Sequence, residues 1–346
     1  MLVLIIAALL PIFSAHRPSP VELRAGAPLR SFPQMSPPLW RIGLAFTAIY
    51  FIWGSTFLAT RFAVQALPPF FVAGFRFFLG GLILFLLGRA RSSEPLTHAH
   101  WFDAAKLGLL FFVICHGAVS WAAQHVPSGV AALLMASIAL WTAIVERLLQ
   151  TQTRPGGRVL FSLGGGFVGL AILVIKPESL AGSTQAQTAS LAVLGGALTW
   201  AVATVLAPRT LRPPSNFTCA GMQMLCGGAI LLLGSALFTP PSLDRVTSVT
   251  VGALAYLTIA GALVGFLSYT YLLQHFPPTK VATYAYVNPV VALLLGWALA
   301  GETISAQSLV ASLVVLASVA TIVLSRSAAV SPRWPNSRPV PAEQGA

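Results

Sequence analysis

One arginine stands inside a long apolar stretch of this chain, where a charged side chain needs a reason. Arg76 lies in the run PPFFVAGFRFFLGGLILFLLGR, about two helical turns from its start, or roughly 10 Å along a helix. A guanidinium at such depth faces a cavity or a partner, because burying it in hydrocarbon is costly. It is then an anchor for a carboxylate or a phosphate. The alternative is a side chain that extends back to the polar edge of its surroundings.

A second group of polar residues recurs at helical spacing. His116, Ser120 and Gln124 are four residues apart, so they lie on one face of a helix. His116 is the histidine deepest within an apolar run. An unperturbed imidazole titrates near neutrality, so His116 is a candidate proton acceptor. The alternative is a histidine that hydrogen-bonds a neighbouring carbonyl.

A proline marks a third candidate position. Tyr284 and Asn288 are four residues apart, and Pro289 follows directly. Proline inside a helix removes one hydrogen bond and frees the carbonyl of Ala285. Such free backbone at membrane depth is tolerated where it is buried in protein or lines a cavity. We therefore place the binding site here, with a structural kink as the alternative.

Aromatic and hydroxyl side chains complete the candidate set. Trp53 precedes Gly54, Ser55 and Thr56 in the first apolar run, and Trp200 occupies the matching place in the second half of the chain. Tryptophan and tyrosine stack on aromatic or cationic solutes. The predicted substrate-binding residues are Trp53, Ser55, Arg76, His116, Trp200, Tyr284 and Asn288. We expect Arg61, Glu302 and Glu146, which lie near the ends of apolar runs, at the membrane interface.

Several chemistries lack their sequence signals. There is no Walker A string, no HExxH motif and no Cys/His cluster at metal spacing, so we expect no cofactor, no metal and no catalytic residues. The letters from Gly164 to Gly169 match GxGxxG, but they lie in an apolar run without a preceding strand, which indicates helix packing. The net charge of +12 forms no dense basic stripe, which argues against nucleic-acid binding.

The elements that position these residues are membrane helices. Hydrophobic residues make up 56% of the 346 residues and charged residues 8%, against about 25% charged in soluble domains. A lipid bilayer is therefore the expected surrounding, and each crossing needs roughly 20 apolar residues. Ten such stretches can be drawn, at 42–67, 69–88, 104–124, 128–149, 158–175, 189–208, 217–238, 248–273, 279–300 and 307–325.

The two halves of the chain repeat one another. At one constant spacing Trp53 matches Trp200, Arg76 matches Gln223, and Gly80-Gly81 matches Gly227-Gly228. A unit with an odd number of crossings enters the bilayer in the opposite sense the second time. The sequence thus predicts an all-α integral membrane protein with ten transmembrane helices as two inverted five-helix repeats, an arrangement typical of secondary transporters.

Charge and composition set the boundaries and the orientation. Most of the 20 basic residues fall on the side that faces the cytoplasm when both termini are cytoplasmic. The predicted parts are an N-terminal tail (1–40), a first repeat (41–176), a polar loop (177–188), a second repeat (189–326) and a disordered C-terminal tail (327–346). Met35 is a candidate for the true first residue.

Two segments resemble the EamA-type proteins of the drug/metabolite transporter superfamily. They are the opening spans from Ile49 to Arg89, and the stretch VNPVVALLLGWALAGETIS, which has a proline in the ninth span and Glu302 before the tenth. The resemblance covers about residues 42–326 and implies ten helices in two inverted repeats around a central cavity, with export of amino acids or other metabolites. The first half departs from this pattern, because Ile138 and Thr151 stand at the positions that match Pro289 and Glu302 of the second half.

These features favour a secondary transporter of the cytoplasmic membrane. We expect it to export a small metabolite, such as an amino acid, by alternating access, with the solute, protons and lipid as its partners. The alternative is a carrier for nucleotide-sugars or sugar phosphates, which would need several basic residues in the pocket. An intramembrane lipid-modifying enzyme is disfavoured, because acidic residues are few and no nucleophile–base pair is apparent.

Overall fold

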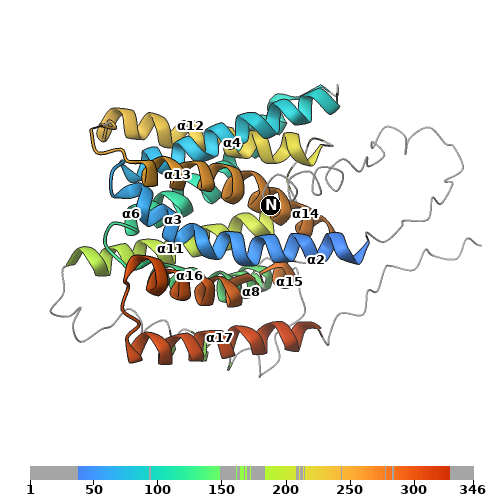
Figure 1. The fold of residues 1–346 in the computed structure, drawn as a ribbon. Coiled ribbons are helices and arrows are strands. Elements are labelled where there is room, and N and C mark those ends of the chain that lie inside the picture. The colour runs from blue at the N-terminus through green and yellow to red at the C-terminus, as the bar shows by residue number, and fades with distance from the viewer. Residues whose placement is uncertain are drawn as a thin grey trace, which may run out of the picture.

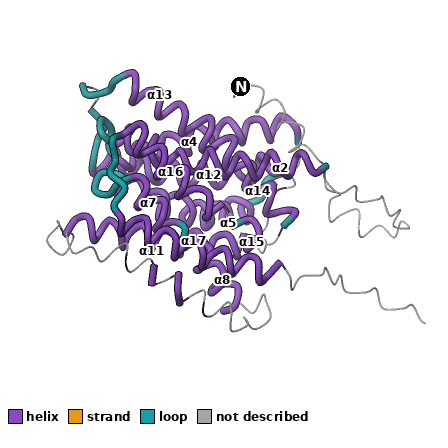
Figure 2. Tube along the Cα trace, turned by 60° about the horizontal axis from the view of Figure 1, so that its bottom comes forward, coloured by secondary structure: helices purple, strands orange, loops and turns teal. Residues whose placement is uncertain are grey.

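The fold is a bundle of long helices, seen in a computed structural model (Figure 1). The structure describes residues 38–92, 95–148, 184–207, 215–242, 244–276, 278–282 and 284–327, with single residues and short runs between 161 and 213. No strand occurs in any of these segments, and the described loops gather mainly at one end of the bundle (Figure 2). The predicted all-α class is confirmed.

Up to residue 148, the described residues form four groups of helices. The first is α2 (Leu39–Thr47), the π-helical turn η3 (Ala48–Ile52) and α3 (Trp53–Val64), and the second is α4 (Pro69–Arg91). The third joins α5 (His98–Gly108), the π-helical segment η4 (Leu109–His116) and α6 (Gly117–Ala122), and the fourth is α7 (Ser128–Met135) with α8 (Ile138–Leu148). The predicted span at 158–175 lies largely outside the described residues.

The second half repeats this order. It contains α11 (Thr184–Leu206), α12 (Asn216–Phe238), the series α13 (Ser248–Tyr256), η6 (Leu257–Phe266) and α14 (Leu267–His275), then α15 (Pro278–Val281) with α16 (Tyr284–Ala300), and α17 (Ala306–Ser327). The π-helical segments η4 and η6 occupy matching places in the two halves. Seven described helices are long and apolar enough to cross a membrane, and shorter apolar helices lie at Val287–Ala300 and Leu309–Ser318. This is a multi-pass membrane protein.

Local sequence explains where the helices begin. Pro69 takes the first position of α4, where its missing N–H costs nothing. Thr97 caps α5 through a hydrogen bond from the backbone N–H of His100, and Thr247 caps α13 in the same way through Thr250. A proline therefore marks the start of α4, and threonine caps mark the starts of α5 and α13.

Matched helices of the two halves pack directly against each other. In Figure 1, α4 and α12 lie side by side at one edge of the bundle, with α17 at the opposite edge. A Cβ added at Gly81 would lie 3.0 Å from the Gly221 carbonyl, and one added at Gly228 would lie 3.0 Å from the Gly74 carbonyl. Gly74 matches Gly221, and Gly81 matches Gly228. The same contact is thus made twice with the halves exchanged, between antiparallel helices.

Glycines from the GxGxxG-like run also serve packing. Gly165 and Gly166 are helical, and a Cβ added at Gly166 would lie 2.7 Å from a Leu140 methyl group. A Cβ at Gly165 would approach the Ser318 hydroxyl at 3.0 Å. This run therefore lies close to α8 and α17, and no strand precedes it among the described residues.

Candidate functional site

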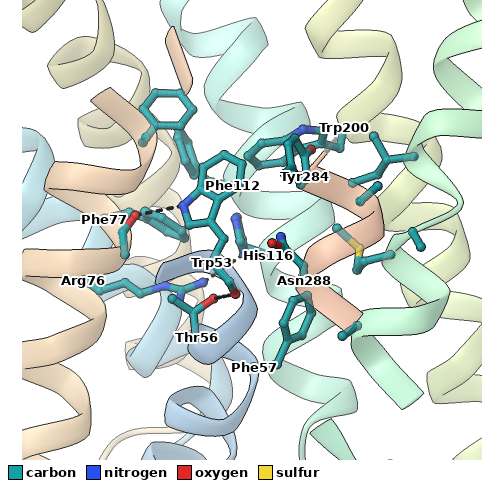
Figure 3. A pocket seen from close by; sticks show the side chains of 17 residues that line it. Trp53, Thr56, Phe57, Arg76, Phe77, Phe112, His116, Trp200, Tyr284 and Asn288 are labelled. Atoms are coloured by element: carbon teal, nitrogen blue, oxygen red, sulfur yellow. Dashed lines mark hydrogen bonds between the residues drawn. The ribbon is translucent and has the colours of Figure 1, made fainter. Parts of the chain in front are cut away.

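Six of the seven predicted site residues line one central cavity (Figure 3). Residues from α3, α4, η4, α7, α8, α11, η6 and α16 enclose it. The cavity has a volume of about 50 Å³, which is room for a few water molecules. In this state the cavity therefore holds a small group rather than a large molecule. The six residues are Trp53, Arg76, His116, Trp200, Tyr284 and Asn288.

Ser55 does not line this cavity. Its hydroxyl donates to the Ile52 carbonyl at 2.7 Å and lies 2.6 Å from the Tyr256 hydroxyl. On a helix, adjacent residues point about 100° apart, so the neighbouring Thr56 reaches the cavity instead. The Thr56 hydroxyl donates to the Trp53 carbonyl at 2.7 Å, which is the local bond expected of a hydroxyl within a helix.

Arg76 is buried at the cavity wall. Its residue is 3% exposed, so a side chain reaching back to the polar edge is ruled out. One guanidinium nitrogen, Nη2, lies 2.9 Å from His116 Nδ1, and the guanidinium carbon lies 4.4 Å from the centre of the Phe77 ring. Within the described part of the chain no carboxylate pairs with Arg76, and its Nε has no hydrogen-bond partner. A buried cation without a counter-charge is costly, so this one has donors to offer an anion.

The Arg76 contact fixes the state of His116. A guanidinium has only donors, so Nδ1 of His116 accepts and the ring proton lies on Nε2. In this contact the imidazole is neutral. The His116 ring also packs near Phe77, with centroids 4.8 Å apart, and edge-on against Trp200 at 5.4 Å.

The two matched tryptophans meet at the centre of the protein. The rings of Trp53 and Trp200 are perpendicular, with centroids 5.5 Å apart, and Tyr284 packs edge-on against Trp53 at 5.1 Å. The Trp53 indole N–H donates to the Gly261 carbonyl at 3.2 Å. A Cβ at Gly265 would collide with this indole, so glycine is needed there. Aromatic faces therefore form one wall of the cavity.

Asn288 joins two helices at the cavity. One end of its amide faces three carbonyls, those of Tyr50 at 2.8 Å, Ile49 at 3.2 Å and Tyr284 at 3.2 Å. Carbonyls only accept, so this end is the NH2 group and donates to them. Tyr50 and Ile49 belong to η3, where π-helical geometry leaves carbonyls available to side chains. Pro289 lies inside α16 directly after Asn288, and Ala285 lines the cavity. The proline thus marks a helix that faces the cavity.

Comparison with known proteins identifies the family of this architecture. The family model described as EamA-like transporter family matches residues 40–175 and again 187–324. The chain belongs to the EamA-like transporter family. It is 33% identical to the Escherichia coli protein "Uncharacterized inner membrane transporter YedA" over 290 residues, which is 82% of this chain and 90% of that protein. "Protein PecM" of Dickeya dadantii is 26% identical over 261 residues, covering 75% and 84%.

A solved crystal structure has the same fold. It superposes with a TM-score of 0.60 at 20% sequence identity, covering 82% of this chain and 97% of the other. Family and fold agree with the membrane helices described above. The protein is thus a membrane transporter of the drug/metabolite transporter type, and both matches of the family model carry part of the cavity.

The two EamA repeats contribute unequally to the cavity. Gln223, which matches Arg76, is buried away from the cavity, and its amide donates to the Cys219 sulfur at 3.4 Å. Phe266 ends η6 in the second repeat as His116 ends η4 in the first, and it lines the cavity as an apolar side chain. The positive charge and the imidazole therefore both come from the first repeat.

The three polar residues predicted on one face of the third span have different surroundings in the structure. Ser120 is fully buried without a hydrogen-bond partner for its hydroxyl, and Gln124 is exposed at the end of the helix. Of the three residues, His116 alone lines the cavity. Ser120 lies on α6, one turn beyond His116, and Gln124 lies beyond the end of α6 at Ala122.

Glu302 and Glu146 both lie near helix ends, as predicted, but their side chains are buried within the protein. The Glu302 side chain is 7% exposed, and it binds Arg61 at 2.9 Å and the backbone N–H and hydroxyl of Ser128 at 3.0 and 2.9 Å. It therefore caps α7 and ties α3 to the loop before α17. Arg61 is 32% exposed and keeps its predicted place near a helix end. Glu146 is 2% exposed, so it is packed within the protein.

Phenylalanines supply the part of the site that sequence reasoning missed. Phe57, Phe77, Phe112 and Phe266 line the cavity, as does Met135. The chain has 21 phenylalanines, most of them in apolar runs, so no spacing singles these out. The only signal was proximity, since Phe77 follows Arg76 and Phe57 follows Thr56.

Proposed function

We propose that this transporter exports a small metabolite that carries a negative group and an apolar body, such as an amino acid or a related carboxylate. One observation carries the proposal. Arg76 is buried at a central cavity without an acidic partner in the described part of the chain. A solute carboxylate would supply the missing counter-charge through charge-assisted hydrogen bonds.

The remaining wall favours an apolar or aromatic body. Trp53, Trp200 and Tyr284 present ring faces and edges, and Asn288 contributes an amide whose oxygen is an acceptor for an ammonium or hydroxyl group. Six predicted residues would thus act together in binding, and Ser55 would support α3 through Tyr256. Aromatic groups give large contact area with few rotatable bonds, which suits a cavity that must bind and release.

Two inverted five-helix repeats would move this cavity between the two faces of the membrane. The duplicated glycine contact of α4 and α12, and the meeting of Trp53 with Trp200, support a pseudo-two-fold axis through the centre. Because α4 and α12 are antiparallel, that axis lies in the membrane plane, which suits rocking of the repeats in alternating access. Ten crossings would place both termini in the cytoplasm, in agreement with the basic residues.

Replacement of Arg76 tests the proposal. Cells that overexpress the protein are grown against a panel of toxic amino acids, amines and dyes, and efflux of the protected class is then measured with labelled compound. We expect tolerance to anionic or zwitterionic compounds, and we expect Arg76→Gln to reduce their efflux at least about tenfold, since a charged hydrogen bond contributes about 1.5–3 kcal/mol.

A control on the same helix separates binding from membrane insertion. Arg91 is exposed at the end of α4, so Arg91→Gln should reach the membrane and keep efflux at the wild-type rate. Unchanged efflux in Arg76→Gln would refute the anchor role. Protection against cationic dyes alone would refute the anionic solute, and transport of phosphorylated sugars would favour the alternative carrier class.

A further inference from the structure

The contact between Arg76 and His116 occupies a donor that an incoming anion would need. Arg76 Nη2 lies 2.9 Å from His116 Nδ1, and both side chains face the cavity (Figure 3). This inference rests on the proposed function, in which an anionic group binds Arg76. A carboxylate that takes two guanidinium donors competes with the imidazole for Nη2. The solute therefore changes the surroundings of Nδ1 when it binds.

The groups around the pair leave one place for an added proton. Cys115 on η4, Tyr269 on α14 and Tyr284 on α16 are the other titratable groups nearby, and thiols and phenols already hold their protons at neutral pH. The neighbouring side chains of α3 and α11 are Trp53 and Trp200, which do not titrate. No Asp, Glu or Lys occurs among the described residues that line the cavity.

We propose that an anionic solute and one proton bind together at the Arg76–His116 pair, so that the transporter moves both in the same direction. The solute takes Nη2 of Arg76, and this leaves the lone pair of His116 Nδ1 without a donor. A proton from water on the same side then binds Nδ1, and the imidazolium donates to the solute. On the opposite side the solute leaves, the proton is released from Nδ1, and Arg76 Nη2 returns to it.

Charge balance favours this order over exchange of solute for proton. A protonated His116 without solute would place two buried cations side by side, with no carboxylate among the described lining residues. With the anion bound, the cavity holds the same net charge as when it is empty. This coupling is reciprocal. If the bound anion raises the affinity of His116 for a proton by some factor, the bound proton raises the affinity for the anion by the same factor.

The proposal has a consequence for export. One carboxylate and one proton carry no net charge across the membrane, so the membrane potential does not drive their movement. Outward flow then requires an outward solute gradient larger than the inward proton gradient. The transporter would act as a release route for a metabolite that has accumulated inside the cell.

Proton uptake on binding tests the inference in the purified full-length chain. The probe is phenylpyruvate, an aryl carboxylate that stays ionised between about pH 6 and pH 8, the range around the titration of imidazole. Binding is measured in weakly buffered detergent solution with a pH indicator. The wild-type protein should take up close to one proton per bound probe. Its affinity should rise by up to about tenfold for each unit of falling pH while His116 is neutral in the free protein.

His116→Asn is the informative variant. Its amide oxygen takes the place of Nδ1 as acceptor for Arg76, but it binds no proton. We expect weaker probe binding, with no proton uptake and no dependence on pH. His125 lies outside the cavity, so His125→Asn should keep the wild-type proton uptake.

The outcomes separate this inference from the proposed function. Probe binding by the wild-type protein without proton uptake overturns the inference and leaves the anion carrier in place. Proton uptake that persists in His116→Asn also overturns it, because the proton then binds elsewhere. Binding that is unaffected by Arg76→Gln, or no binding of any anion in the panel, removes the proposed function and this inference with it.

Discussion

Glu302 provides the sharpest prediction for stability, because its role rests on four defined contacts. One carboxylate oxygen accepts from Arg61 at 2.9 Å and from the Ser128 backbone at 3.0 Å, and the other accepts from the Ser128 hydroxyl at 2.9 Å and the Gly129 backbone at 3.4 Å. Except for Arg61, which lies on α3, these donors lie at the start of α7, where a helix favours negative charge. A Cβ at Gly296 would collide with the carboxylate, so glycine makes room for it.

The geometry sets the size of the effect. Glu302→Gln keeps the shape of the side chain but removes the charge and turns two acceptor positions into donors. Because the carboxylate is 7% exposed, we expect a loss of about 2–3 kcal/mol, typical of charged hydrogen bonds in a partly buried site. Arg61 is 32% exposed and screened by solvent, so Arg61→Gln should cost about 0.5–1 kcal/mol.

Thermal unfolding of the purified protein in detergent measures both variants. At about 2–4 °C per kcal/mol for a large domain, Glu302→Gln should lower Tm by about 4–12 °C and Arg61→Gln by about 1–4 °C. The double variant should unfold close to Glu302→Gln, because the arginine has then lost its partner. Equal losses in the two single variants would show that the ion pair, and not the α7 cap, supplies the stability.

Two further predictions concern helix packing and the cavity wall. Gly81→Ala should lower the free energy of unfolding by about 1–3 kcal/mol, because the added methyl group would press on α12. Gly234 has nothing within 4 Å of an added Cβ, so Gly234→Ala should be neutral or stabilise by up to about 1 kcal/mol in the same unfolding assay. Asn288→Leu should lower the free energy of unfolding by at least about 2 kcal/mol and reduce efflux, because three carbonyls of η3 and α16 lose their donor. Unfolding and efflux like those of the wild-type protein would contradict that role.

For clear physical reasons, the sequence predicted the membrane class and singled out six of the residues that line the cavity. An arginine or a proline inside an apolar run is costly unless the protein uses it, so Arg76 and Asn288-Pro289 stand out from the residue order alone. The internal duplication paired Trp53 with Trp200, and the structure brings the two rings to 5.5 Å. Ser55, also predicted to bind substrate, does not line the cavity, because helical neighbours of a lining residue point elsewhere.

The amino-acid sequence alone therefore determined that the chain is an all-helical membrane protein with a repeated unit, because composition and apolar periodicity set secondary structure and membrane insertion over a few helical turns. The tertiary structure decided which polar groups meet. It placed His116 against Arg76, buried Glu302 at the start of α7, and lined the cavity with four phenylalanines that look like any others in the sequence. These pairings depend on helix rotation and crossing, which long-range packing sets and local sequence does not encode.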